Sequence, residues 1–197
     1  MTIDRDVELL YEIGTMRHIT RSWHQFGGVN FANLAEHTLR VMWIGFVIAK
    51  YEGADIGKVL QIALIHDLSE TRTGDTNYLS RMYVNTNEEQ ALQDTIENTI
   101  LDDEIYDLWQ EYKVRETLEA KIVKDADNLD PDFELFERRS VNGSRQREEF
   151  EQIRAVVAGR LYTRTAKRIF DALYTSDPES WHLNAPNRHV AGDWQSE

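Results

Sequence analysis

Apolar residues recur through most of the chain at the three- and four-residue spacing of an amphipathic helix. The clearest stripe is formed by Leu34, His37, Val41, Ile44 and Ile48. It predicts a helix from about residue 33 to residue 51, and the glycine that follows at position 53 is a typical helix end. Similar spacing predicts helices over 7–15, 56–68, 88–101, 103–112, 114–128 and 145–174, whereas no segment alternates convincingly as a strand would. The predicted fold class is all-α, a single-domain helical bundle.

Helix-breaking residues are rare until the end of the chain. Of the three prolines, Pro131 is expected to close a helix or to begin the next one, and the other two lie in the last twenty residues. From residue 177 onward the helical spacing is lost. The chain is therefore predicted to form one domain over residues 1–176, followed by an extended tail over 177–197. A chain of this length can bury a core without disulfides or other cross-links.

Composition limits the location and the partners. No apolar run approaches the ~20 residues that a membrane span requires, and the first residues, MTIDRDVELL, are acidic where a signal peptide would be basic. Cysteine is absent, which excludes disulfides and thiolate metal ligands. These features favour the cytoplasm and give no reason to expect a membrane partner. The net charge of −13 repels a polyphosphate backbone, so duplex nucleic acid is not expected as a partner. A small anion can still bind where local cations or a metal reverse the field.

Four polar residues fall on helix faces that are otherwise apolar. His37 lies on the stripe described above, His66 shares the inner face of the next predicted helix and precedes Asp67, and Asp127 follows the apolar residues of a third. Burial of an unpaired carboxylate costs several kcal/mol, and a buried histidine also needs partners. A single inward histidine is commonly a satisfied core residue, but four such residues on three helices favour one divalent metal ion. Imidazole and carboxylate ligands suit Mn, Co, Fe, Ni, Zn or a hard cation such as Mg.

These residues carry a resemblance to a known family. Glu36-His37, His66-Asp67 and Asp127 within "KDADNLD" resemble the H…HD…D signature of the HD-domain metal-dependent phosphohydrolases. Arg21, Trp23, "AEH", "HDLSE", "TGD" and "DAD" follow one another in the order seen in the branch of 5'-deoxynucleotidases. The resemblance covers about residues 21–130 and implies a bundle of the HD-domain type.

The resemblance implies a role for each of these positions. His37, His66, Asp67 and Asp127 would be the metal ligands. Asp125 is a rival for the last position, but two residues along a helix place it on nearly the opposite side. Asp130 is either an acceptor for a ligand's hydrogen bond or a solvated charge after the helix end.

Four further residues would act on the substrate. By resemblance, Glu70 and Asp75 would face the phosphate and the attacking water, Arg21 would bind the phosphate, and Trp23 would bind the deoxyribose. Each also has a structural interpretation. Asp75 belongs to a Thr-Gly-Asp turn, Glu70 could pair with Arg72, Arg21 could form a surface ion pair and Trp23 could be a core residue. The sequence does not decide which carboxylate is the acid and which positions the water.

The resemblance implies a metal-dependent phosphoric monoester hydrolase, a 5'-deoxynucleotidase that converts deoxynucleoside 5'-monophosphates to deoxynucleoside and phosphate. Two alternatives stay open: hydrolysis of another phosphate, such as a nucleoside triphosphate, and a noncatalytic module stabilised by a metal. Relatives in this branch are commonly dimers, and the tail carries Trp181 and Trp194. A homodimer is therefore expected, with the tail ordered against the bundle or across the interface. The alternative is a disordered tail with two exposed tryptophans.

Overall fold

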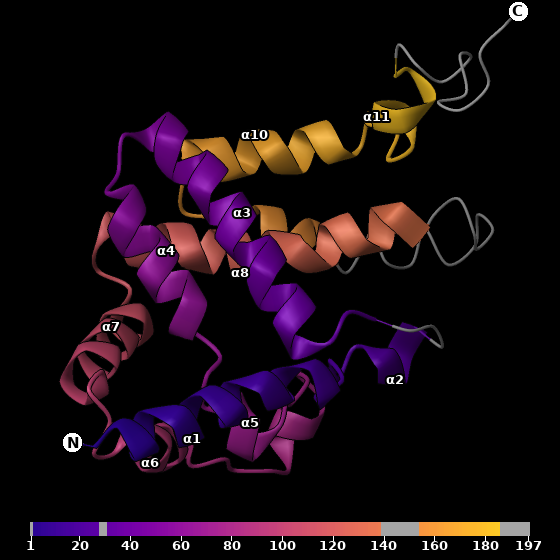
Figure 1. The fold of residues 1–197 in the computed structure, drawn as a ribbon. Coiled ribbons are helices and arrows are strands. Elements are labelled where there is room, and N and C mark those ends of the chain that lie inside the picture. Colours follow the sequence, from indigo (N-terminus) through magenta and orange to yellow (C-terminus); the bar gives the residue numbers. More distant parts are fainter. Residues whose placement is uncertain (1, 28–30, 139–153, 186–197) are drawn as a thin grey trace, which may run out of the picture.

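The computed structural model describes residues 2–27, 31–138 and 154–185, and these residues form helices joined by turns (Figure 1). This confirms the all-α fold class. In chain order the helices are α1 Ile3–Gly14, α2 His24–Gly27, α3 Leu34–Glu52, α4 Ile56–Ile65, α5 Glu70–Thr73, α6 Glu88–Ile96, α7 Asp102–Val114, α8 Leu118–Arg138, α10 Arg164–Leu173 and α11 Ser180–Leu183. Two short 3-10 helices, η1 Thr15–His18 and η2 Ser80–Met82, complete the described elements.

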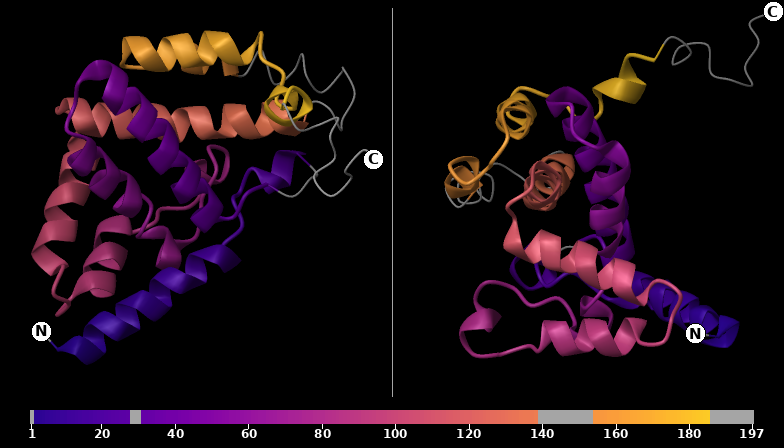
Figure 2. Two further views of the ribbon diagram at one scale, coloured as in Figure 1. Left: turned by 45° about the horizontal axis from the view of Figure 1, so that its top comes forward. Right: turned by 90° about the vertical axis from the view of Figure 1, so that its left-hand side faces the viewer.

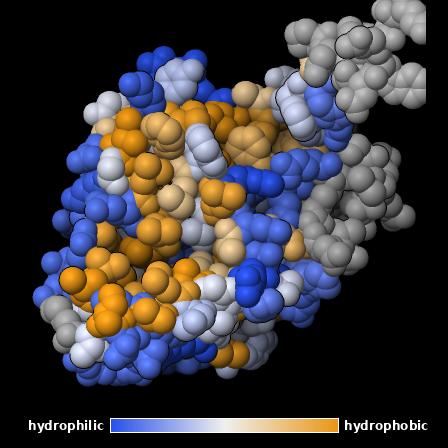
Figure 3. Space-filling view, in the orientation of Figure 1, coloured by the Kyte–Doolittle hydropathy of each residue, from blue (hydrophilic) through white to orange (hydrophobic). Residues whose placement is uncertain are grey.

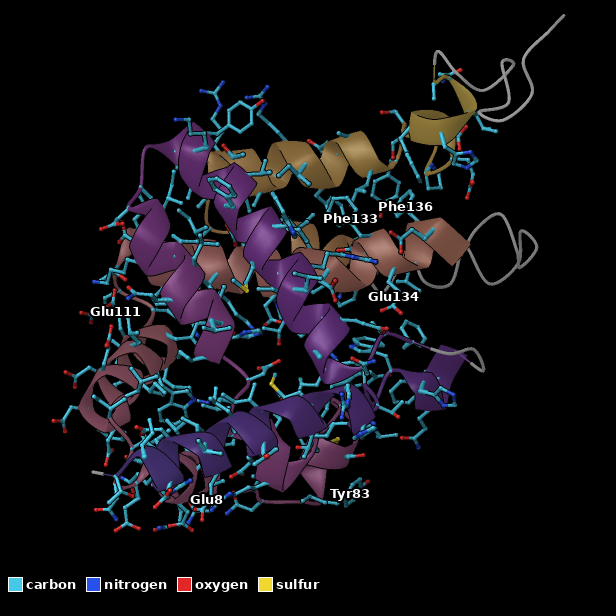
Figure 4. The ribbon with its side chains drawn as sticks, in the orientation of Figure 1. Glu8, Tyr83, Glu111, Phe133, Glu134 and Phe136 are labelled. Atoms are coloured by element: carbon cyan, nitrogen blue, oxygen red, sulfur yellow. The ribbon has the colours of Figure 1, made fainter. Side chains whose placement is uncertain are left out.

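Helices α3, α4 and α8 form the centre of the bundle and pack against one another. α10 covers α8 on one side, and α1, α5 and α6 lie together on the other (Figures 1 and 2). In Figure 4, Phe133 and Phe136 of α8 lie between α8 and α10, where the Phe136 ring meets that of Tyr174 edge-on at 5.2 Å. None of the described helices combines the length and the apolar character needed to cross a membrane.

The apolar core consists of two clusters. The larger one joins α3, α4, α8 and α10 and includes Ile62 and Ala63, while the smaller one joins α1, α6 and α7 to Ile65 and Leu68. The segment that carries His66 and Asp67 therefore lies where the two clusters meet. The side chains of His66 and Asp67 therefore point into the molecule between the two clusters, and not into the middle of either one.

The ends of α3 follow directly from local sequence. The Asn33 side chain accepts a hydrogen bond from the Glu36 N–H at 3.0 Å, and the Glu36 carboxylate accepts one from the Asn33 N–H at 3.0 Å. This capping box satisfies two backbone donors at the helix start. Gly53 ends the helix with φ of 71°, a left-handed conformation that glycine adopts at little cost. Both ends of the helix predicted from the sequence are confirmed.

Several predicted helix boundaries are wrong, among them the start of the first helix, which is Ile3 rather than residue 7, and three of the differences have a local reason. α4 ends at Ile65 rather than near 68, because the chain turns over residues 66–69 before α5 begins. α6 ends at Ile96 rather than near 101, and Asn98 follows with a positive φ of 63°. The helix predicted over 114–128 begins at residue 118, since Arg115 adopts φ of 58° and separates it from α7.

Pro131 neither closes α8 nor begins a new helix, because α8 continues through it to residue 138. The intrahelical bond from residue 131 to the carbonyl of residue 127 is missing, since proline has no N–H. The carbonyl group of Asp127 therefore accepts no hydrogen bond from residue 131, although the helix itself is continuous.

The single long helix predicted over 145–174 is interrupted. Residues 154–158 are helical, residues 159–163 are not, and α10 begins at Arg164. The buried carboxylate of Asp125 stabilises the break by accepting the N–H groups of Tyr162 and Thr163, both at 2.8 Å, and the Thr163 hydroxyl at 2.7 Å. Residues 145–153 of this predicted helix lie outside the described residues.

Residues 180–183 of the predicted extended tail form the short helix α11. Trp181 in this helix is 79% exposed, so the described residues leave most of its ring uncovered. Trp194 lies outside the described residues.

Candidate metal centre

The four predicted metal ligands converge at one point. One ligand atom from each of His37, His66, Asp67 and Asp127 lies within 4.8 Å of the others. The Nε2 atoms of the two histidines are 3.3 Å apart, and the Asp67 Oδ2 atom is 3.3 Å from the first and 3.2 Å from the second. The Asp127 Oδ1 atom is 3.4 Å from His37 Nε2. α3, the turn after α4 and α8 supply these residues, so the packing of the three central helices against one another sets their positions.

The other nitrogen of each histidine ring is already occupied. His37 Nδ1 lies 2.6 Å from Asp130 Oδ2, and His66 Nδ1 lies 2.8 Å from the Ala63 carbonyl oxygen. A carbonyl oxygen can only accept, so the hydrogen of His66 is on Nδ1 and its Nε2 presents a lone pair. Two imidazole nitrogens and two carboxylate oxygens thus face one another. A divalent cation at their centre fits this set of donors, because it would turn four mutually repelling lone pairs into ligands.

Asp127 is held so that one oxygen stays free. Its Oδ2 atom accepts hydrogen bonds from Lys124 Nζ at 2.7 Å and from the Tyr112 hydroxyl at 3.1 Å. Its Oδ1 atom is the one that faces the histidines. The Tyr112 ring also meets the His66 ring edge-on at 5.6 Å. Lys124 and Tyr112 therefore favour metal binding by Asp127 through a single oxygen.

Charge in the site is arranged as a cation would require. Burial alone would raise the pKa of Asp67, but the two neighbouring histidines lower it below its ordinary value. Burial acts in the same direction on Asp127, whose pKa is nevertheless lowered well below the usual range by Lys124 and the same histidines. Burial alone would lower the pKa of His37, but hydrogen bonds with three surrounding aspartates raise it well above the ordinary value. Without a metal, a proton on His37 takes the place of a cation.

The site is open on the side of the carboxylates. Both histidine side chains are fully buried, whereas the side chains of Asp67 and Asp127 keep 18% and 16% of their area exposed. A ligand from solvent would therefore approach past these two aspartates.

Glu70 lies at the start of α5, one turn beyond the ligands, and is 9% exposed. Its Oε2 atom is buried without a hydrogen-bond partner among the described residues. Burial, together with the charges of Asp67 and Asp75, raises the pKa of Glu70 to about 10. The pairing with Arg72 considered above is not observed, because that guanidinium binds the Glu12 carboxylate at 2.7 and 2.9 Å.

Arg21 and Asp75 form a buried pair beside the ligands. The Asp75 Oδ2 atom accepts hydrogen bonds from the Ser22 N–H at 2.7 Å and the Ser22 hydroxyl at 3.0 Å, and Arg21 Nε lies 3.3 Å away. Arg21 Nη1 lies 4.0 Å from Asp67 Oδ2. Arg21 is 8% exposed, which rules out a surface ion pair, and its Nε and Nη1 atoms have no hydrogen-bond partner among the described residues.

Trp23 lies at the edge of this group and is half-buried, so it is not a core residue. Its ring is 6.1 Å from the rings of both Phe26 and Tyr78, which stack on each other at 5.3 Å. Asn77 Nδ2 also donates to the Gln25 side chain at 3.0 Å. The segment after Arg21 and the turn around Asp75 thus lie side by side, joined by polar and aromatic contacts.

Several residues of the site were not predicted from the sequence. Lys124 could have been found, since it precedes Asp127 by one helical turn. Tyr112 gave no signal, because it comes from a different helix. Asp130 is the acceptor for His37 rather than a solvated charge, and Asp125 faces away from the ligands as expected.

Known proteins are similar to this chain in sequence and in fold. The family model described as HD domain matches residues 13–169, which is most of the chain. The chain therefore belongs to the HD-domain family, and it is an HD-domain metal-dependent phosphohydrolase. The resemblance drawn from the ordered motifs is confirmed.

Several named proteins and solved structures resemble this chain. The protein named 5'-deoxynucleotidase HDDC2 from Danio rerio is 26% identical over 149 residues, 72% of this chain and 73% of that protein. Its counterpart from Dictyostelium discoideum is 30% identical over 139 residues, 63% of this chain and 72% of that protein. The solved structure of a conserved hypothetical protein from Pyrococcus furiosus matches with a TM-score of 0.66 and 28% identity, covering 86% of this chain and 99% of that one.

Replacing Asp127 by asparagine should abolish stoichiometric metal binding, because the three remaining ligands lose the charge that Asp127 contributes. Elemental analysis of the purified variant measures this loss. Asp125→Asn is the matched control, since it changes the same side chain two residues away. It should retain the metal and lose about 1–3 kcal/mol of unfolding free energy, because it disturbs a buried acceptor. If only the Asp125 variant loses the metal, Asp125 is the ligand and Asp127 is not.

Replacing Asp130 by alanine should weaken metal binding by about 10- to 100-fold, because the His37 ring would lose the hydrogen bond at Nδ1 that orients Nε2 toward the other ligands. Competition with a chelator of known affinity measures the change. Glu137→Ala is the control. Glu137 lies on α8, as Asp130 does, and its half-exposed carboxylate accepts a hydrogen bond from Arg40 at 3.0 Å. Equal metal affinity in both variants would show that Asp130 has no part in ligand orientation.

Proposed function

We propose that this chain is a 5'-deoxynucleotidase, which hydrolyses deoxynucleoside 5'-monophosphates to deoxynucleoside and phosphate. The observation that carries the proposal is the buried guanidinium of Arg21, which forms ion pairs with Asp75 and Asp67, has two nitrogen atoms without a hydrogen-bond partner among the described residues, and lies next to the four converging side chains. A phosphate monoester needs a cation on one side and hydrogen-bond donors on the other. The similarity to proteins named 5'-deoxynucleotidase HDDC2 supports the same substrate class.

In this proposal His37, His66, Asp67 and Asp127 hold one divalent metal ion. When bound, the ion supplies positive charge to the phosphate and lowers the pKa of a coordinated water. The donor set of two imidazoles and two carboxylates accepts several transition metals, so the identity of the ion is not part of the proposal.

Arg21 and Trp23 would bind the substrate. The Arg21 guanidinium would bind phosphate oxygens, while its ion pairs with Asp75 and Asp67 hold it beside the site. Trp23 would form an apolar wall for the sugar, supported by its contacts with Phe26 and Tyr78. The partner is thus a small nucleotide, which is compatible with the net charge of −13 because the local cations lie inside the site. The cytoplasmic location stays a prediction.

Glu70 and Asp75 would handle the proton. Hydrolysis forms a bond from the water oxygen to phosphorus, breaks the bond from phosphorus to the 5' oxygen, and leaves one proton for that oxygen. Glu70 is buried and its raised pKa of about 10 keeps a proton on the carboxyl group at neutral pH. It is therefore suited to donate to the leaving oxygen. Asp75 has Oδ2 bound to Ser22, which leaves Oδ1 to position the water.

Phosphate release from a panel of nucleotides tests the substrate class. We expect release from deoxynucleoside 5'-monophosphates with Mn, Co or Zn, little from ribonucleotides and 3'-monophosphates, and none after chelation. Tripolyphosphate or pyrophosphate as the product from nucleoside triphosphates would instead identify an HD hydrolase of another phosphate. No release from any nucleotide with any metal, in a protein that still binds metal, would leave a noncatalytic module.

Two variants should separate chemistry from binding. Glu70→Gln should retain the metal and lower kcat by about 10²- to 10⁴-fold, because the amide cannot donate the proton. Arg21→Ala should mainly raise KM, by about 10- to 100-fold, because it removes charged hydrogen bonds to the phosphate. Steady-state kinetics with elemental analysis measure both. Arg17→Ala is the control, since Arg17 is exposed in the preceding segment. A Glu70→Gln enzyme with unchanged kcat would remove Glu70 from the chemistry.

A further inference from the structure

The carboxylate of Asp130, which contacts the His37 ring, has a second charged neighbour on α3. Its Oδ2 atom lies 2.6 Å from His37 Nδ1, and its Oδ1 atom lies 3.6 Å from Nε of Arg40. The Asp130 side chain is 3% exposed, so water solvates little of it. A carboxylate in such a place needs hydrogen bonds or an opposite charge. Arg40 supplies a permanent positive charge at the oxygen that His37 does not use.

The helical repeat places this pair directly beside the predicted ligands. Arg40 follows His37 by three residues on α3, and Asp130 follows Asp127 by three residues on α8. Residues three apart lie on the same face of a helix. The contact between His37 and Asp127, at 3.4 Å, is therefore followed one turn later by the contact between Arg40 and Asp130. Both contacts join the same two helices.

The other end of the Arg40 side chain reaches solvent. Its Nη2 atom donates a hydrogen bond to Glu137 Oε2 at 3.0 Å, and the Glu137 side chain is 48% exposed. Both residues line a hollow of about 540 Å³, whose other walls come from α3, α8 and the segment before α3. Figure 3 shows apolar side chains gathered over α1, α3 and α4, with hydrophilic ones beside them. An ion pair at such an exposed place contributes little to stability.

Stability of the helix pair alone does not explain the position of Arg40. Its Nη1 atom is buried and has no hydrogen-bond partner among the described residues, and an unpaired buried donor costs stability. The inner contact has a different consequence. With Oδ1 next to a cation, the Asp130 carboxylate keeps Oδ2 directed at His37 Nδ1, which in turn directs Nε2 of the ring toward the other predicted ligands.

We infer that Arg40 is a positioning residue of the metal centre, which acts through Asp130 on His37. The charge of Arg40 holds the carboxylate, and the carboxylate holds the ring. The inference rests on the metal site of the proposed function, but it does not depend on the substrate.

Metal affinity of the full chain, measured by competition with a chelator of known affinity, tests this role. Arg40→Ala should lower the affinity for Mn or Zn by about 10-fold, because the carboxylate that orients His37 is no longer held. Arg40→Lys should stay within about 3-fold of the wild type, since it returns a positive charge beside Asp130. Arg40→Gln is its matched control, a polar side chain without charge, and should be as weak as Arg40→Ala. Circular dichroism verifies the fold of each variant.

Two further variants separate this role from a general contact between α3 and α8. Glu137→Ala removes the outer ion pair of Arg40 and should leave the metal affinity unchanged, because the contact with Asp130 is kept. The double variant Arg40→Ala/Asp130→Ala should bind metal no more weakly than Asp130→Ala alone. Arg40 then has no carboxylate to hold, so its own replacement adds no further loss.

Three results would overturn the inference. The first is wild-type metal affinity in Arg40→Ala. The second is an Arg40→Lys protein as weak as Arg40→Ala, which would show that charge beside Asp130 is not what acts. The third is an additive loss in the double variant, or an equal loss in Glu137→Ala, which would assign the effect to packing of α3 on α8. A wild type without metal affinity would remove this inference and the proposed function together. A wild type that binds metal but releases no phosphate from any nucleotide would remove the proposed function alone.

Discussion

The main physical constraint on this fold is that four electron-rich side-chain atoms, from His37, His66, Asp67 and Asp127, are held close together inside the bundle. Two imidazole nitrogens and two carboxylate oxygens face one another within 4.8 Å, at a place where the two apolar clusters meet. Such a group is unfavourable without a positive charge, because each member is desolvated and repels the others. The surrounding residues hold it in place from outside. Asp130 and the Ala63 carbonyl orient the histidines, while Lys124, Tyr112 and Arg21 occupy the outer side of the aspartates.

The early end of α4 is a consequence of the same requirement. A regular helix to residue 68 would carry the chain past the ligands, whereas the turn over 66–69 starts α5 with Glu70 one turn beyond His66. Asp75 then returns the chain to Ser22 and Arg21, fifty residues earlier in the sequence. One short segment thus supplies two of the four converging side chains, the buried carboxyl group of Glu70 with its raised pKa, and the carboxylate that pairs with Arg21. The polar residues that follow α4, from His66 to Asp75, are explained by their common location at one site.

Helical spacing predicted the bundle and the ends of α3 correctly, because its capping box and its glycine are local signals. The spacing predicted helix ends wrongly where contacts between residues far apart in the sequence determine them. The break before α10 is stabilised by Asp125, which lies 37 and 38 residues earlier, and spacing within 145–174 cannot reveal that acceptor. The ordered motifs predicted the four converging ligands and the neighbourhood of Glu70, Asp75 and Arg21. Tyr112 was missed because its contact with Asp127 joins two different helices, and the residues around Tyr112 in the sequence do not indicate this contact.

α3 shows how one helix can serve two purposes. His37, Val41, Ile44 and Ile48 point into the bundle, while Leu39, Trp43 and Phe46 point away from it. α4 is similar, with Ile62 inside and Leu64 outside, immediately before the turn that carries His66. The distance between His37 and His66 is therefore set by how α3 and α4 pack on their inner sides.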